Sequence, residues 1–348
     1  MKEQQWERKR ALILSGGGGR GAYHCGVYEY LETIGWRPDI LVGTSIGAIN
    51  AAAIASGRTA TQLKELWLKL DTGKVQRLRT DILDFDRWTY LLDTNPWRRS
   101  LLEDGWFDFD YINGGQSPTL AIVATDVWTG DITVFCNRPL EKSRSGGPHS
   151  KKVRCEPISI NHIMASCSIP ILYPWTSTGS EEATYWDGAV VSNTPLGTAL
   201  RAGATEIVVV LLSPWEEKGA VSPESRTSFK LWTLPGLALD WVLLASFRAD
   251  LKLCKALNMF AAAYELLDQE QRRKLAARLL DTATAEEQDA LLERLESYNF
   301  VQPPTIIAPR QLLPVEQIVT YDPIVHRQLF KQGFADAVRD MRHMVTSE

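Results

Sequence analysis

Short apolar runs alternate with segments of helical periodicity along the first seventy residues. Residues 11–14 and 40–42 are continuous apolar runs that end in glycine or serine, which predicts two buried strands. Residues 21–34 carry apolar side chains at helical spacing up to a glycine, and residues 46–55 are rich in alanine, so each predicts a helix. Residues 62–70 predict a further amphipathic helix.

The alternation continues further along the chain. Residues 119–124 and 132–135 read as strands, residues 160–166 as a helix, and residues 205–212 as the clearest buried parallel strand. Strands that alternate with helices predict an α/β fold with a mostly parallel central sheet flanked by helices. Residues 73–117 show no pattern that predicts an element.

After residue 215 the pattern changes, and it divides the chain into three parts. Residues 216–228 are polar and linker-like, and residues 229–300 read as helical, with a capping box of Thr284 and Glu287. A strand at 305–308 and a helix at 323–344 then return to the α/β pattern. We expect a catalytic core over 1–215, a linker and helical insertion over 216–300, and a strand and helix over 301–348 that complete the core.

Composition and charge exclude several classes of protein. The net charge of −4 gives no electrostatic support to a nucleic-acid partner. The five cysteines form no CxxC, and the five histidines form no HExxH, so we expect neither a metal site nor a cofactor. The charged start contains no signal-peptide segment. These features predict a cytoplasmic protein with reduced thiols.

Gly43-Thr44-Ser45-Ile46-Gly47 is a G-x-S-x-G motif between a predicted strand and a predicted helix. This is the setting of a nucleophile elbow, in which small flanking residues let a strained turn close around an exposed serine. The amino end of the following helix directs its dipole and free N–H groups at the developing oxyanion. Ser45 is therefore the candidate nucleophile.

A glycine-rich loop, residues 16–21, follows the first strand and opens the first helix. A P-loop would require Lys followed by Ser or Thr after the last glycine, and a dinucleotide site would require an acid after the second strand; both are missing. Consecutive glycines instead expose N–H groups beside Ser45, and Arg20 adds positive charge. We expect an oxyanion hole built from Gly17, Gly18, Gly19 and Arg20.

No histidine has an evident catalytic position, so another residue has to act as the general base. His24 and His162 fall in predicted helices, His149 in a polar loop, and His326 and His343 in the last helix. Asp187, in the sequence Asp187-Gly188-Ala189, follows a strand-like run and offers a carboxylate instead. A buried carboxylate of raised pKa can take a serine proton directly.

Together these motifs resemble the patatin-like phospholipases, which combine a G-G-G-x-[RK]-G loop, a G-x-S-x-G elbow and a D-G-[AG] aspartate. The matching glycines are Gly16, Gly21, Gly43, Gly47 and Gly188. Residues 165–170 also resemble the family's A-S-x-x-x-P block, whereas Ser15 stands where many members have Asp. The resemblance covers about residues 10–215 and 305–345, but not 229–300. It implies a metal-free Ser45–Asp187 dyad that hydrolyses acyl esters of phospholipids or lysophospholipids.

The resemblance leaves two alternatives: a transacylase or general carboxylesterase on the same dyad, and a regulatory or interaction protein on the same fold. A lipid substrate also favours reversible contact with a membrane surface. Residues 231–247 form the most apolar window in the chain. They are interpreted either as buried core or as an interfacial lid, and the lid's contact residues would be Trp232, Leu237, Trp241, Leu244 and Phe247.

Overall fold

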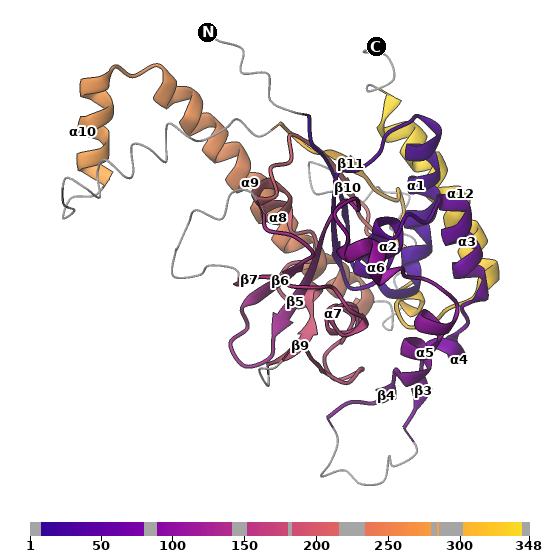
Figure 1. Ribbon diagram of the computed structural model, residues 1–348. Coiled ribbons are helices and arrows are strands. Elements are labelled where there is room, and N and C mark those ends of the chain that lie inside the picture. Colours follow the sequence, from indigo (N-terminus) through magenta and orange to yellow (C-terminus); the bar gives the residue numbers. More distant parts are fainter. Residues whose placement is uncertain are drawn as a thin grey trace. The chain divides into compact units, whose positions relative to one another are not determined.

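The computed structural model describes residues 8–79, 89–140, 152–179, 183–215, 234–279, 284 and 302–342. Its centre is a sheet in the order β11-β10-β1-β2-β5-β6-β7, with β9 paired to β5 and β8 paired to β9 (Figure 1). The strands are β1 Arg10–Leu14, β2 Ile40–Thr44, β5 Thr119–Asp126, β6 Ile132–Cys136, β7 Lys152–Cys155, β8 Thr176–Ser177, β9 Thr184–Asp187, β10 Glu206–Val210 and β11 Thr305–Ile307.

Five adjacent strands of this sheet, from β11 to β5, run parallel, and β6 and β7 are also parallel to each other. The β5–β6, β5–β9 and β8–β9 pairs are antiparallel. Every residue of β2 is buried, as are nearly all residues of β1, β5 and β10, because helices cover a parallel sheet on its faces. The predicted α/β fold with a mostly parallel sheet is confirmed.

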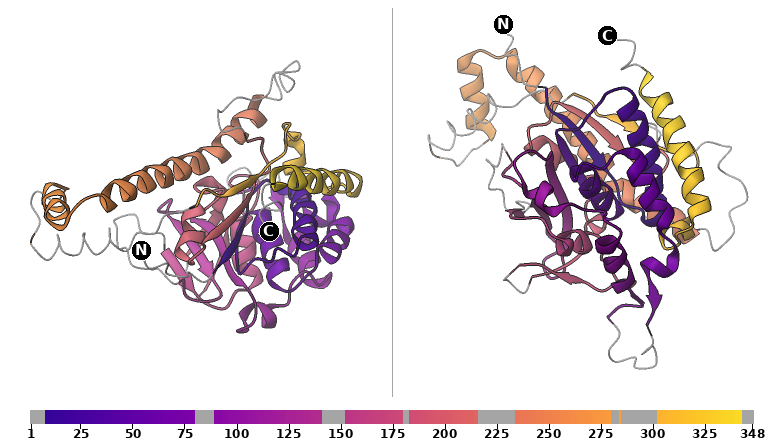
Figure 2. Two further views of the ribbon diagram at one scale, coloured as in Figure 1. Left: turned by 90° about the horizontal axis from the view of Figure 1, so that it is seen from above. Right: turned by 45° about the vertical axis from the view of Figure 1, so that its right-hand side comes forward.

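Helices pack against the sheet and against one another. α2 contacts β1, β2 and β5, and α7 contacts β5. α1, α3 and α12 contact one another and lie together on one side of the sheet in Figures 1 and 2. The bounds are α1 Ala22–Thr33, α2 Ile46–Ala55, α3 Ala60–Lys69, α7 Ile160–Ser166, α8 Leu196–Arg201 and α12 Pro323–Asp340.

The segment for which no element was predicted, residues 73–117, contains only short ones. They are α4 Thr72–Val75, β3 Arg77–Leu78, β4 Leu92–Asp93, α5 Asn95–Glu103 and α6 Phe109–Asn113. The helices α4 and α6 are shorter than two turns, and each strand has two residues, so a hydrophobic period cannot repeat in them. Their packing depends on single large side chains instead, such as the buried indoles of Trp97 and Trp106.

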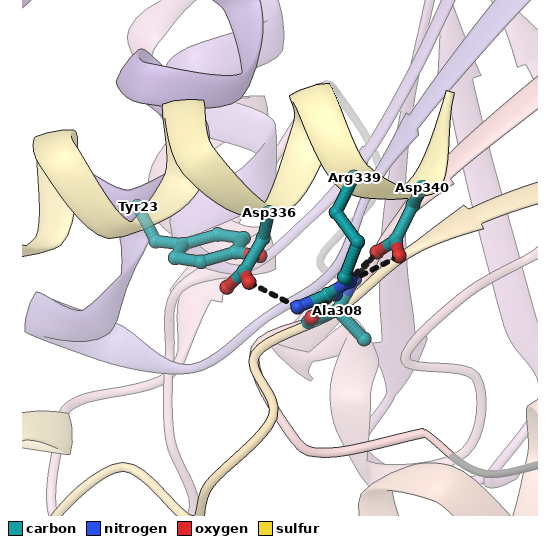
Figure 3. Close-up of polar contacts among 5 residues, drawn as sticks. All are labelled: Tyr23, Ala308, Asp336, Arg339 and Asp340. Atoms are coloured by element: carbon teal, nitrogen blue, oxygen red, sulfur yellow. Dashed lines mark hydrogen bonds and ion pairs between the residues drawn. The ribbon is translucent and has the colours of Figure 1, made fainter. Parts of the chain in front are cut away.

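A polar network fastens the last helix to the first one (Figure 3). The Tyr23 hydroxyl on α1 donates to Asp336 on α12 at 3.0 Å. Arg339 pairs with Asp336 and with Asp340, and it donates to the carbonyl oxygen of Ala308 at 2.8 Å, just after β11. The network therefore connects α1, α12 and the end of β11.

The chain divides into two compact units, one of residues 1–247 with 304–348 and the other of residues 248–303. Helix α9, Leu234–Glu265, begins in the first unit and continues into the second, which also contains α10, Gln269–Leu279. The capping box predicted at residues 284–287 lies outside the described residues except for Thr284. Within the described part of the chain, no helix combines the length and the apolar character that a membrane span requires.

Candidate active site

Ser45 lies at the turn between β2 and α2, where the backbone is strained. Its φ of 56° and ψ of −129° are rare for a residue with a side chain, and such values occur at nucleophile elbows. The turn can close because its glycines lack side chains. A Cβ on Gly47 would lie 2.1 Å from the carbonyl oxygen of Leu14, and one on Gly43 would lie 2.4 Å from that of Gly47.

Ser166, on α7, supports the elbow by linking it to strand β5. Its hydroxyl accepts a hydrogen bond from the Ser45 N–H at 2.9 Å and donates to the carbonyl oxygen of Val123 at 2.6 Å. Ser166 was not among the predicted site residues, although it belongs to the block of residues 165–170. That block was the available signal for it.

Asp187 lies at the end of β9 and beside the elbow. β9 pairs with β5 so that Asp187 stands opposite Ala124, and the preceding residue, Val123, stands opposite Thr44 on β2. Because β5 pairs with both β9 and β2, Asp187 comes to lie next to Ser45, the residue after Thr44. Gly188 makes the approach possible, because a Cβ there would lie 2.3 Å from the carbonyl oxygen of Val123.

The environment of Asp187 favours a base that works near neutral pH. Burial raises the pKa of this carboxyl to about 7, because the charged form loses its hydration. Hydrogen bonds from the Ser45 side chain and from the Ala189 N–H, the latter at 2.8 Å, stabilise the carboxylate and oppose that rise. The carboxyl is thus close to the serine and half ionised near neutral pH.

The glycine loop lies against the same elbow. A Cβ on Gly16 would lie 2.9 Å from the Cβ of Ser45, so the two backbones are in close contact. The Gly16 N–H donates to Asn193 Oδ1 at 2.7 Å, a contact that no sequence motif indicated. Gly17 and Gly18 have φ of 154° and 59°, values that glycine tolerates best, and residues 18–21 form a single 3₁₀ turn.

The Arg20 side chain turns to other partners than those expected from the sequence. It is fully buried, and its Nη1 pairs with Asp240 Oδ1 at 2.7 Å. Nη2 and Nε donate to the carbonyl oxygens of Leu313 and Pro314 at 2.9 and 3.2 Å. These contacts occupy the guanidinium group, so its charge is matched by Asp240 instead of being directed at an oxyanion. The place of Arg20 in the oxyanion loop stays a prediction.

Of the two interpretations of residues 231–247, Leu244 and Phe247 agree with the buried core. Both side chains are buried, and the Phe247 ring packs on Trp215 with centroids 5.1 Å apart. Both residues belong to the first unit. Trp241 is half-buried, and the side chains of Trp232 and Leu237 lie outside the described residues.

The hydrogen bonds of the three described histidines are made with residues other than Ser45 and Asp187. His24 Nδ1 lies 3.1 Å from Asn50 Nδ2, His162 Nδ1 lies 3.0 Å from the Ser159 N–H, and His326 Nδ1 lies 3.0 Å from the carbonyl oxygen of Trp67. Burial lowers the pKa of His24 to about 3 and that of His326 to about 4. His149 and His343 lie outside the described residues.

A hollow elsewhere on the sheet bears on the choice of site. An open hollow of about 520 Å³ lies at the amino ends of β2 and β5, lined by Asp39, Thr119 and Arg138 among others. Ser45 lies at the opposite, carboxyl end of these strands, where ligands bind in open α/β sheets.

Over the residues that can be described, no three His, Cys, Asp or Glu side chains group as metal ligands would.

Comparison with known proteins agrees with this geometry. The family model of the patatin-like phospholipases matches residues 12–200. Human patatin-like phospholipase domain-containing protein 6 is 46% identical over 219 residues, which are 60% of this chain but only 14% of that protein. The uncharacterized protein YqhO of Bacillus subtilis is 29% identical over 242 residues, which cover 63% of this chain and 76% of YqhO.

Among solved structures, VipD from Legionella pneumophila covers 97% of this chain at a TM-score of 0.42 and 12% identity. The match to the family model extends from β1 through the elbow and Asp187 to α8, which is more than half of the chain. The chain therefore belongs to the patatin-like phospholipase family and is a lipid acyl hydrolase.

Proposed function

We propose that this protein hydrolyses ester-linked acyl chains of phospholipids or lysophospholipids through an acyl-enzyme on Ser45, with Asp187 as the general base. One observation carries the proposal: a buried carboxyl with a pKa of about 7 lies beside a serine in a strained elbow and receives a hydrogen bond from it. A base of this pKa is half ionised near neutral pH and can accept the serine proton.

The steps follow from this arrangement. The Asp187 carboxylate takes the proton from Ser45 Oγ as that oxygen attacks the ester carbonyl carbon. The tetrahedral intermediate collapses, the alcohol leaves with the proton from Asp187, and the acyl group stays on Ser45. Asp187 then takes a proton from water as the water oxygen attacks the acyl-enzyme, and it returns that proton to Ser45 Oγ as the bond to the acyl group breaks and the fatty acid leaves.

The negative charge of each tetrahedral intermediate needs hydrogen-bond donors. We assign this role to backbone N–H groups of Gly17–Gly19 together with the amino end of α2. The Gly16 N–H is already bound to Asn193, and the Ser45 N–H is bound to Ser166. Such donors act mainly in the transition state, and each contributes about 10²–10³-fold to turnover.

A lipid substrate has to be reached at a membrane surface, and we propose that the loops beside Asp187 make this contact. Trp128, in the turn after β5, is 75% exposed, and its ring centroid lies 6.4 Å from that of the exposed Trp175. Val190 and Val191, just after Asp187, are also exposed. Tryptophan favours the membrane–water boundary because its ring is apolar and its N–H is polar.

Transfer of the acyl group to an alcohol other than water is the second candidate within catalysis. The acyl-enzyme is common to hydrolysis and transfer, and the acceptor decides between them. Products identified by mass spectrometry distinguish the two, since transfer yields a new ester and hydrolysis yields free fatty acid.

The test is the release of fatty acid from a panel of phosphatidylcholines, lysophosphatidylcholines and p-nitrophenyl esters. The wild type should release fatty acid, and Ser45→Ala should lower the rate by on the order of 10³-fold or more. Ser56→Ala is the matched control, since Ser56 is a buried serine at the other end of α2 whose hydroxyl donates to the Ala52 carbonyl oxygen and accepts from the Asp108 N–H. A folded Ser45→Ala protein with the wild-type rate, or a wild type inactive on every ester, would refute the proposal.

A further inference from the structure

Resting on the proposed function, we infer that Asp240 is a positioning residue for the reaction, which holds the oxyanion loop in place through Arg20. Asp240 lies on α9, more than two hundred residues beyond the loop in the sequence. Nothing in its local sequence connects it with catalysis, and its carboxylate does not touch the reacting serine. Its role follows from the contacts of its side chain.

The Asp240 carboxylate joins three segments at one point. Its Oδ1 accepts a hydrogen bond from Arg20 Nη1 at 2.7 Å and a second one from Ser213 Oγ at 2.7 Å. Ser213 lies just after β10, and Arg20 lies inside the glycine loop. All three side chains are buried, so water contributes little to their solvation. Arg20 therefore depends on Asp240 for a matching charge.

The remaining donors of Arg20 fix the direction of its guanidinium group. Nη2 and Nε bind the carbonyl oxygens of Leu313 and Pro314, which precede the short 3₁₀ helix η6, Val315–Ile318. A planar fork that is bound at three nitrogens has one orientation. Because Arg20 directly follows Gly19, that orientation also limits the path of the glycine loop.

The glycines themselves cannot hold the loop, since they have no side chains to pack. Their backbone instead lies close to distant segments. A Cβ on Gly18 would lie 1.7 Å from the carbonyl oxygen of Ile318, and one on Gly19 would lie 2.2 Å from that of Thr320. A Cβ on Gly17 would meet Leu212 at 2.8 Å. In addition to these backbone approaches, the loop has one ion pair among the described residues, between Arg20 and Asp240. Arg20 lies near the end of the loop.

Loss of the Asp240 charge should therefore reduce turnover more than substrate binding. Asp240→Asn leaves a buried guanidinium without its counter-ion, and the loop then shifts to solvate it. Displacement of a catalytic group by about 1 Å can cost on the order of 10²-fold. We expect kcat for p-nitrophenyl butyrate to fall by about 10-fold to 100-fold, with KM changed less than about twofold.

The experiment compares kcat, KM and thermal midpoint for three variants with the wild type. Asp336→Asn is the matched control, since Asp336 is also buried and paired with an arginine, but its partners are Tyr23 and Arg339 and not Arg20. It should lose stability with nearly unchanged kcat. The double variant Arg20→Met/Asp240→Leu removes both charges while it keeps apolar volume. It should be more stable than Asp240→Asn, yet its kcat should stay low, because the fork that fixes the loop is gone.

Three results would overturn the inference: a folded Asp240→Asn protein with wild-type kcat, a loss of kcat in Asp336→Asn equal to that in Asp240→Asn, or full recovery of kcat in the double variant. Ser45→Ala in the same series separates this inference from the proposed function. If Ser45→Ala is inactive while Asp240→Asn is fully active, the proposed function stands and only the positioning role falls.

Discussion

Ser45 and Asp187 are both held in states that cost free energy. Ser45 has a positive φ without being glycine, and Asp187 is a carboxyl removed from water. Such states persist where the surrounding structure determines them, as Ser166 and the Ala189 N–H do here. The cost at Asp187 can be measured without any substrate, because it depends on pH.

We predict that Asp187→Asn stabilises the fold at alkaline pH. The folded-state pKa of about 7 is raised above the unfolded value of about 3.9, so the contribution of this carboxyl to stability is complete below pH 4 and is lost as pH rises through 7. Asparagine carries no charge and avoids that loss. Above pH 8 the variant should gain on the order of 4 kcal/mol in free energy of unfolding.

Chemical denaturation at pH 4, 6 and 8 measures this gain. The difference between variant and wild type should shrink toward zero as pH falls to 4. Asp131→Asn, at an exposed aspartate, is the control and should show no such trend. Equal stability of Asp187→Asn and wild type at pH 8 would mean that Asp187 is solvated in the folded protein.

The residues of the site differ in how far the sequence could indicate them. Ser45 and Asp187 stand in short motifs whose spacing reflects a local turn. Ser166 and Asn193 act through hydrogen bonds to residues far away in the sequence. The block of residues 165–170 pointed to Ser166, whereas no motif pointed to Asn193. The ion pair of Arg20 could not be predicted either, because its partner Asp240 lies on a distant helix.

At the scale of the element, the long periodic segments were predicted well. Helices α2 and α7 have the predicted bounds, because apolar side chains and small residues repeat there over whole turns. The helix predicted from residue 323 begins there and is described to residue 340. The short helices α4 and α6 were missed, since each forms on one capping aspartate and the packing of a single side chain.

The elements proposed to contact a membrane are those next to Trp128 and Trp175. β9 pairs with both β5 and β8, and in the turn after β5 the Val127 N–H donates to the Thr184 carbonyl oxygen of β9 at 3.0 Å. On the proposed membrane contact, Trp128→Ala/Trp175→Ala should bind phosphatidylcholine vesicles about tenfold more weakly than the parent protein. Flotation on a Ser45→Ala background measures binding without hydrolysis.

The control for flotation is Leu102→Ala/Ile324→Ala, which removes two exposed apolar side chains from α5 and α12. It should bind vesicles as the parent protein does. If both double variants float equally well, the contact lies elsewhere. If the parent protein does not float at all, the protein reaches its substrate without stable docking.

At the scale of the whole molecule, the site is assembled from segments that are widely separated along the chain. The loop that begins at Gly16 contacts residues near 193, 212 and 318, and its arginine contacts Asp240 and Leu313. The patatin-like family match ends at residue 200, yet the neighbours of the loop extend far beyond that point. Residues after 200 therefore influence a site whose motifs all precede them.

The central claim is that Ser45 is the nucleophile and that Asp187 activates it. The most direct measurement is reaction with a fluorophosphonate probe, followed by peptide mass spectrometry to locate the adduct. We predict a single adduct on Ser45 in the wild type, none in Ser45→Ala, and labelling slowed by on the order of 10³-fold in Asp187→Asn. An adduct on another serine, or wild-type labelling of a folded Asp187→Asn protein, would contradict the account.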